Sequence, residues 1–338
     1  MELKCIIDKK TSVRNALKSY FNLSNNLISK LRKEGKIHLN GKSINLDEIA
    51  KVNDKLVVNL DFEEESENIV PVKMDLDILY EDEAMLIVNK PPHTPVHPSI
   101  NHYEDSLSNG VKYYFDTIGL KRKIRPVVRL DKDTSGIVIF AKNEYIQECL
   151  ISQMKEGKFE KEYLAILKGK LNEPVITVEA NIKRENESII KRCVSPDGAY
   201  AKTIFKVIKE FEDYTLVKCS LFTGRTHQIR LHAKYIGNPV LGDDLYGTSS
   251  SLISRQALHS YKVKFIHPLT KKNIEIECDL PDDMKQIIWS FHIVCYFVII
   301  SFLRSFSNFF KLFFGVGKSS GIVPPFLAIT PLIFLPIV

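Results

Sequence analysis

The first segment that could carry chemistry reads RLDKDTSG and spans residues 129–136. It leads into an apolar run, so we expect Asp131 to lie on a loop at the start of a strand, where a rigid sheet holds the carboxylate and the loop leaves it accessible. A carboxylate in such a place can act as a nucleophile or as a base. An Asp in a polar turn is more often structural, so this loop alone assigns no function.

A second segment, GRTHQIR at residues 224–230, is expected to begin a helix that ends near Gly237. Helical spacing would turn three apolar side chains inward, namely Ile229, Ala233 and Ile236. His227, Arg230 and Lys234 would then share another face. That face suits a carboxylate or phosphates, although a merely solvated basic face would have the same pattern.

The third segment is KEYLAIL at residues 161–167. Tyr163 is expected to start a strand, and it could equally be an ordinary core residue. This segment is one of several strand-like runs that follow residue 70. The others lie at residues 77–80, 85–88, 137–141, 201–207, 214–221, 261–266 and 274–278. Several alternate apolar with polar residues and few helical segments intervene, which predicts an α+β domain with a mixed, largely antiparallel sheet.

A small basic module is predicted over residues 9–60. We expect helices over residues 13–21 and from a cap at Ser24 to residue 34, with Gly35 in a left-handed exit. The pair Asn40-Gly41 then predicts a hairpin with a type I′ turn. Eleven Lys or Arg against four acids make this module a candidate for binding a polyanion; a solvated basic surface is the alternative.

An acidic stretch, residues 61–67, carries five acids and no base and predicts a flexible linker. The expected organisation is therefore a basic module at 9–60, a linker at 61–73 and a larger domain at 74–288. Residues 289–338 form a hydrophobic tail whose final run is long enough for a membrane span but contains four prolines. A membrane-associated tail, a hydrophobic flap that folds back and an aberrant extension all stay open.

Composition adds bounds on class and compartment. The 338 residues include 47 Lys or Arg and 41 Asp or Glu, a mild basic excess that permits a polyanionic partner without requiring one. Six scattered cysteines indicate neither a disulfide framework nor a zinc site. The first ten residues lack the apolar region of a secretory signal, so we expect a cytoplasmic protein.

The order and wording of five segments are more specific than any one of them. They are NKPPHTPVHPS (89–99), RLDKDTSG (129–136), KEYLAIL (161–167), GRTHQIRLH (224–232) and GNPVLGDDLYG (237–247). Together they resemble the RluA family of pseudouridine synthases over about residues 74–285, and the basic module resembles the alpha-L RNA-binding fold of a ribosomal protein. The resemblance implies a catalytic α+β fold, an RNA substrate, isomerisation of uridine to pseudouridine, and no cofactor or metal.

The same resemblance implies roles for single residues. Asp131 matches the essential aspartate of the family, and Arg230 resembles the arginine that pairs with it. Tyr163 resembles the tyrosine that stacks near the uracil and is implicated in removing the proton at C5. Arg129 resembles the arginine that enters the base stack, and His227 is expected to contact substrate.

One position departs from the family pattern, because Val128 stands where a His commonly precedes the Arg-Leu-Asp sequence. The reaction itself breaks the bond from ribose C1′ to uracil N1 and rejoins the uracil through C5, so no redox carrier is required. An ionised Asp131 can attack the sugar or remove a sugar proton, and both routes stay open.

Two other functions compete with this interpretation. A binding-only, ribosome-associated protein would keep the basic module and could dispense with Asp131. An aspartate-dependent hydrolase acting on phosphates would normally show more carboxylates for a metal, or a glycine-rich phosphate loop. We expect a monomer that modifies large-subunit ribosomal RNA, with transfer RNA as the alternative substrate.

Overall fold

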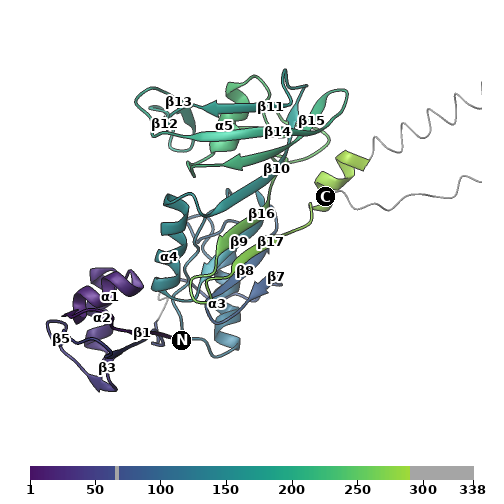
Figure 1. Cartoon of the computed structure of the whole chain (residues 1–338). Coiled ribbons are helices and arrows are strands. Elements are labelled where there is room, and N and C mark those ends of the chain that lie inside the picture. Colours follow the sequence, from purple (N-terminus) through teal and green to yellow (C-terminus); the bar gives the residue numbers. More distant parts are fainter. Residues whose placement is uncertain (65–67, 290–338) are drawn as a thin grey trace, which may run out of the picture. The chain divides into compact units, whose positions relative to one another are not determined.

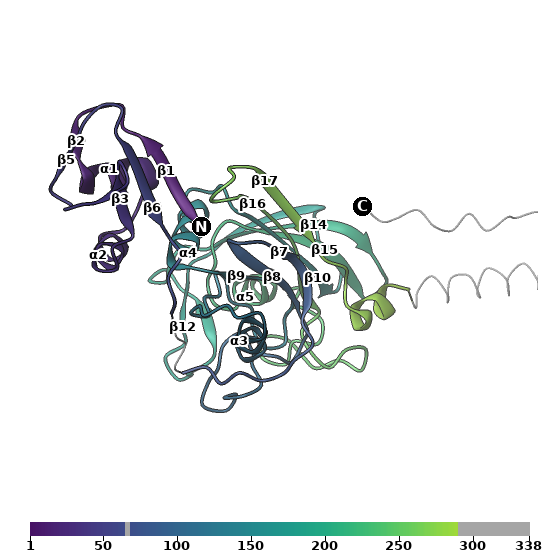
Figure 2. The same ribbon diagram turned by 90° about the horizontal axis from the view of Figure 1, so that it is seen from below.

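The computed structural model describes residues 1–64 and 68–289, and Met1–Ile287 form one compact unit. Figures 1 and 2 show this unit in two perpendicular views. Within the described ranges no helix is both long enough and apolar enough to cross a membrane. Apart from Trp289, the predicted hydrophobic tail lies outside the described residues, and so do the three alternatives for its role.

The amino-terminal part contains the two predicted helices, α1 (Val13–Phe21) and α2 (Asn25–Lys33). Ser12 and Ser24 cap them, each accepting a hydrogen bond from a backbone N–H of the first turn. Four strands form a sheet in the order β1-β6-β3-β4: β1 (Glu2–Ile6), β6 (Lys55–Asn59), β3 (Ile37–Leu39) and β4 (Lys42–Ser43). A small pair of strands, β2 (Thr11–Ser12) and β5 (Ile49–Ala50), completes this part. Asn40 and Gly41 have φ angles of 51° and 79°, as the predicted type I′ turn requires.

The stretch expected to be a flexible linker makes specific contacts before residue 65. Phe62 is buried in the hydrophobic core. The Glu64 carboxylate accepts hydrogen bonds from both terminal nitrogens of Arg125, at 2.7 and 2.8 Å, and from Lys30 at 2.5 Å. These cations offset the repulsion between neighbouring acids, so the expectation of an extended, unanchored chain does not hold for residues 62 and 64.

The large domain is built on one nine-stranded sheet. Its main path runs β11-β14-β15-β10-β16-β9-β8-β7, and β17 pairs with β16. The strands are β7 (Asp77–Glu81), β8 (Met85–Lys90), β9 (Ser135–Ala141), β10 (Glu160–Lys168), β11 (Val175–Glu179), β14 (Lys202–Glu210), β15 (Tyr214–Leu221), β16 (Leu258–Ile266) and β17 (Asn273–Glu277). All eight predicted strands are present, and only the β16·β9 pairing is parallel. The predicted mixed, largely antiparallel α+β fold is confirmed.

The sheet narrows where β9 meets β16, because only two residue pairs join these strands, His259 with Ser135 and Ser260 with Gly136. Gly136 has a φ of 111°, and a Cβ at this position would lie 2.2 Å from the backbone oxygen of Ser260. Only glycine allows this approach. The glycine of the RLDKDTSG segment therefore fixes where the Asp131 loop joins β9.

Helices α3 (Leu107–Thr117) and α4 (Glu144–Lys155) lie beside the half of the sheet that contains β7 to β9, whereas α5 (Gln228–Tyr235) lies beside the half with β11, β14 and β15 (Figure 1). A two-stranded hairpin, β12 (Ile182–Arg184) and β13 (Arg192–Val194), borders α5. The strand-like runs of the sequence did not include β11, β12 or β13. The predicted helix after residue 227 ends at Tyr235, and Ile229 and Ala233 are buried as expected.

Candidate active site

Asp131 lies on the loop that enters β9, as its sequence context predicted. The backbone oxygen of Asp131 accepts a hydrogen bond from the N–H of Thr134 at 3.1 Å, which closes the turn. The side chain keeps 26% of its surface exposed. Its carboxylate is therefore held by a defined turn and yet accessible to a substrate.

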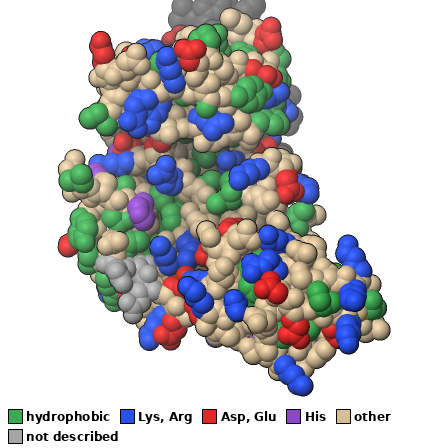
Figure 3. Space-filling view, turned by 90° about the vertical axis from the view of Figure 1, so that its left-hand side faces the viewer, with side chains coloured by type: hydrophobic (Ala, Val, Ile, Leu, Met, Phe, Trp, Pro, Cys, Tyr) green, Lys and Arg blue, Asp and Glu red, His purple; other side chains and the backbone are tan. Residues whose placement is uncertain are grey.

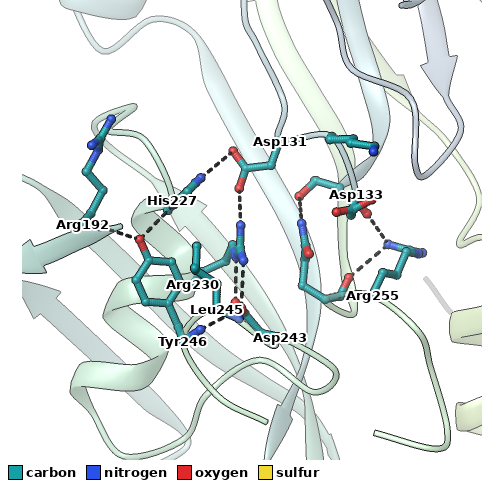
Figure 4. Close-up of polar contacts among 12 residues, drawn as sticks. Asp131, Asp133, Arg192, His227, Arg230, Asp243, Leu245, Tyr246 and Arg255 are labelled. Atoms are coloured by element: carbon teal, nitrogen blue, oxygen red, sulfur yellow. Dashed lines mark hydrogen bonds and ion pairs between the residues drawn. The ribbon is translucent and has the colours of Figure 1, made fainter. Parts of the chain in front are cut away.

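Arg230 connects Asp131 to a second carboxylate (Figure 4). Its Nη1 donates to Asp131 Oδ2 at 3.2 Å, while Nε and Nη2 donate to the two oxygens of Asp243 at 2.7 and 2.8 Å. Arg230 is 7% exposed and Asp243 is completely buried. Burial disfavours the guanidinium, but the two carboxylates outweigh it and raise the pKa of Arg230, so this residue stays cationic.

His227 approaches Asp131 from the other side. It is the residue that precedes α5, in a left-handed conformation with a φ of 57°, and its Nε2 lies 3.8 Å from Asp131 Oδ1. Nδ1 lies 2.9 Å from the hydroxyl of Tyr246, which also accepts a hydrogen bond from the backbone N–H of Arg192 at 2.8 Å. The hydroxyl proton is then free to be donated to Nδ1, which leaves a hydrogen on Nε2 facing the carboxylate. Burial lowers the pKa of His227 although Asp131 opposes that shift, which favours the neutral ring.

Tyr163 lies on β10, at the bulge where its pairing with β16 shifts register. The ring is 7% exposed. Burial, reinforced by the charge of Asp131, raises the pKa of Tyr163 to about 12, while a hydrogen bond with Ser260 opposes the shift. The side chain is thus a neutral phenol at ordinary pH, and the charge of Asp131 acts on it.

Comparison with known proteins identifies the family. Residues 84–235 match the model of the family described as RNA pseudouridylate synthase. The chain is 41% identical over 254 residues to the uncharacterized RNA pseudouridine synthase YjbO of Bacillus subtilis, and the match covers 75% of this chain and 90% of YjbO. The chain belongs to the RNA pseudouridine synthase family. It is an isomerase, and the resemblance seen in the sequence is confirmed.

This pseudouridine synthase is also similar to one relative with a more specific name and to one solved human structure. It is 35% identical over 240 residues to ribosomal large subunit pseudouridine synthase D of Blochmanniella floridana, covering 66% of this chain and 75% of that protein. Among solved structures, human RNA pseudouridylate synthase domain containing 1 has a TM-score of 0.50 and 25% identity, covering 61% of this chain and 83% of that one.

Arg129 of this pseudouridine synthase does not join the Asp131 cluster. It is exposed and lines a cavity of about 590 Å³ together with His97, Lys123, Arg125 and Gln147. Burial, reinforced by the charge of Arg129, lowers the pKa of His97. Arg129 therefore stands two residues before Asp131 with an exposed side chain.

Lys90 belongs to the first motif, NKPPHTPVHPS, but the sequence alone did not indicate a role for it. Its side chain is completely buried, and its Nζ donates to the backbone oxygens of Pro91, Thr94 and Lys132 at 2.7 to 2.8 Å. It thereby ties the NKPPHTP loop to the residue that follows Asp131. Burial lowers the pKa of Lys90 to about 7, while the charge of Asp133 opposes this shift.

Asp243 and Tyr246 were likewise quoted in a motif and given no role. Both belong to GDDLYG, and the backbone N–H of Tyr246 donates to Asp243 Oδ1 at 3.0 Å. The signal available in the sequence was an acid and an aromatic three residues apart in a glycine-bounded loop. Only the fold shows that these two side chains meet Arg230 and His227.

Proposed function

We propose that this enzyme converts specific uridines of large-subunit ribosomal RNA to pseudouridine, with Asp131 as its catalytic carboxylate. One observation carries the assignment: Asp131 is accessible, and its two oxygens face Arg230 and His227. Both neighbours are hydrogen-bond donors that can orient the carboxylate. Such a carboxylate can attack C1′ of the ribose or remove a sugar proton.

Arg230 keeps Asp131 oriented through the reaction. Because Asp243 holds Nε and Nη2, only Nη1 remains for the catalytic carboxylate. In the nucleophilic route, one oxygen of Asp131 forms a bond to C1′ as the bond to N1 breaks and the uracil leaves with the electron pair. After the uracil turns, C5 attacks C1′ and the carboxylate leaves with its electrons.

Tyr163 takes part as a phenol, because its pKa of about 12 keeps the proton on its oxygen. The remaining step moves a proton from C5 of the uracil to solvent or to N1, and the number of protons on the base is unchanged. We assign Tyr163 to relaying this proton: its oxygen accepts the proton from C5 while its own proton passes to a neighbouring base. The released Asp131 carboxylate can be that base, since its charge acts on Tyr163. It then passes the proton to N1, directly or through solvent, and is an ionised carboxylate again.

The target uridine must leave its stack to reach Asp131, at a cost of about a few kcal/mol. We assign Arg129 to the vacated position, because its exposed side chain lies beside the loop of Asp131. His227 is assigned to the substrate through its Nε2–H. Val128 is a half-buried apolar residue and supplies no hydrogen bond where the family commonly has His.

The choice of ribosomal RNA rests on two supports. The module at residues 9–60 has an excess of seven cations, and Lys and Arg side chains are visible over much of the face shown in Figure 3. Such surfaces displace counterions from RNA phosphates. The relative from Blochmanniella floridana is named for the large ribosomal subunit. We place the activity in the cytoplasm.

The test is to map pseudouridine in total RNA from a strain that lacks this protein. Loss at one or a few positions of large-subunit ribosomal RNA, restored by the wild-type gene, is the expected result. Loss confined to transfer RNA would contradict the substrate and leave the reaction standing. An unchanged map would contradict both.

A further inference from the structure

The β12–β13 hairpin carries an arginine that the reaction described above does not use. Arg192 begins β13, and its backbone N–H is bound to Tyr246. The Nη1 of its guanidinium is buried and has no hydrogen-bond partner among the described residues. A buried, unpartnered nitrogen on a cation is costly, because water has been lost and nothing replaces it. The usual explanation of a solvated basic surface does not apply to this atom.

The hairpin also places like charges together. In its register Arg184 lies directly opposite Arg192, a cross-strand pair that is repulsive. Arg192 also lines a cavity of about 310 Å³ with Lys191, Lys234 and one acid, Glu185. The positive charges around this cavity exceed the negative ones, so the cavity favours an anion.

The cavity is next to the catalytic cluster. Tyr246 is part of its wall and binds His227, which faces Asp131. Figure 4 shows Arg192 and Asp131 on opposite sides of His227, with the Arg192 side chain extending away from the Tyr246 ring. The charge of Arg192 acts on the His227 ring. An anion bound by Arg192 would therefore lie close to the ring that faces Asp131.

We propose that Arg192 binds a backbone phosphate of the RNA next to the target uridine and so positions the nucleotide for Asp131. This inference rests on the proposed RNA substrate. A phosphate held in this cavity would neutralise the repulsion between Arg184 and Arg192. The Tyr246 hydroxyl contacts both the backbone N–H of Arg192 and the His227 ring, so it would set the position of this phosphate relative to His227.

The test compares full-length variants that all carry Asp131→Asn, so that bound RNA stays unmodified. Binding to large-subunit ribosomal RNA from the deletion strain is measured over a range of salt concentrations. Arg192→Gln should raise Kd about tenfold and lower the slope of log K against log salt by about one. Arg184→Gln removes the same charge from the facing strand and should change Kd by less than about twofold.

Two further readouts separate phosphate binding from a structural role. Arg192→Lys should keep the salt slope and restore part of the affinity. The melting temperature of Arg192→Gln without RNA should equal or exceed that of the parent, because an unpartnered buried charge is removed. Equal effects of Arg192→Gln and Arg184→Gln on Kd would overturn the proposal, and so would a loss of affinity that follows a lowered melting temperature.

The same RNA is incubated in parallel with protein that retains Asp131. If that protein forms no pseudouridine, the proposed function fails, and the comparison of Kd values still decides the role of Arg192. If pseudouridine forms and Arg192→Gln binds like its control, only the phosphate site is wrong.

Discussion

Asp243 holds two of the three guanidinium nitrogens of Arg230, at 2.7 and 2.8 Å, and thereby leaves the third to face Asp131 at 3.2 Å. An arginine that contacted Asp131 alone could adopt several rotamers. The completely buried Asp243 removes that freedom. In the proposed mechanism, Asp131, Arg230 and Asp243 therefore act together, with Asp243 as a positioning residue.

Asp243→Asn is expected to lower turnover about a hundredfold, because a misplaced Arg230 no longer orients Asp131. It should also lower the free energy of unfolding by about 3 kcal/mol, since a buried ion pair loses one partner. Asp244→Asn is the matched control, because Asp244 is the exposed neighbour in the same loop. Single-turnover rates and urea unfolding measure the two effects. Equal behaviour of the two variants would show that Asp243 does not position Arg230.

Gly136→Ala is expected to destabilise the protein by more than about 3 kcal/mol, because the new Cβ would lie 2.2 Å from the Ser260 oxygen, a contact that β16 cannot relieve without moving. Gly119 provides the control. Its φ of 69° is also positive, but a Cβ there would meet no atom within 4 Å, so Gly119→Ala should cost only about 1 kcal/mol. Urea unfolding compares them. Similar losses in the two variants would mean that conformational strain alone, and not the crossing of β9 and β16, requires Gly136.

His259 makes the stability dependent on pH. It is completely buried, its Nδ1 lies 2.9 Å from Ser135 Oγ, and its Nε2 lies 3.2 Å from Cys278 Sγ. Burial lowers the pKa of His259 to about 4. Between that value and about 6.5 the unfolded chain binds the proton and the folded chain does not. The contribution of His259 is therefore complete above about pH 6.5 and is lost as pH falls.

Between pH 6.5 and pH 4, His259 should account for a loss of roughly 3 kcal/mol in the free energy of unfolding. Urea unfolding at a series of pH values measures this slope, and His259→Gln should make it shallower in that interval. An unchanged slope in the variant would assign the acid sensitivity to other groups.

Much of the fold could be predicted from local patterns. Helix α1 follows from the spacing of its hydrophobic residues, and the start of α2 follows from Ser24, a polar residue that can cap a helix. The Asn40-Gly41 turn follows from the tolerance of these residues for positive φ angles. The strands after residue 70 that were not predicted, β11, β12 and β13, are short or mostly exposed, as β11 and β12 illustrate. These strands are held by pairing with a neighbouring strand, and their sequences do not show a clear alternation of apolar and polar residues.

The candidate site divides in the same way. Asp131, Tyr163, Arg230 and His227 could be named from their motifs, because each motif is a continuous segment. Asp243 could not be paired with Arg230, since 13 residues and a change of direction separate them. Arg129 was expected near the site, but its place beside a separate cavity depends on how the 123–129 segment runs past α4.

The most direct test of the central claim is pseudouridine formation by purified protein on large-subunit ribosomal RNA from a strain that lacks it. Wild type, Asp131→Asn and Asp133→Asn are compared, the last because Asp133 lies in the same loop and its carboxylate instead contacts His93 at 2.8 Å. Wild type and Asp133→Asn should form pseudouridine at the positions lost in the strain, and Asp131→Asn should form none while still binding the RNA. Pseudouridine formation by Asp131→Asn at a rate near that of wild type would contradict the assignment of Asp131 as the catalytic carboxylate.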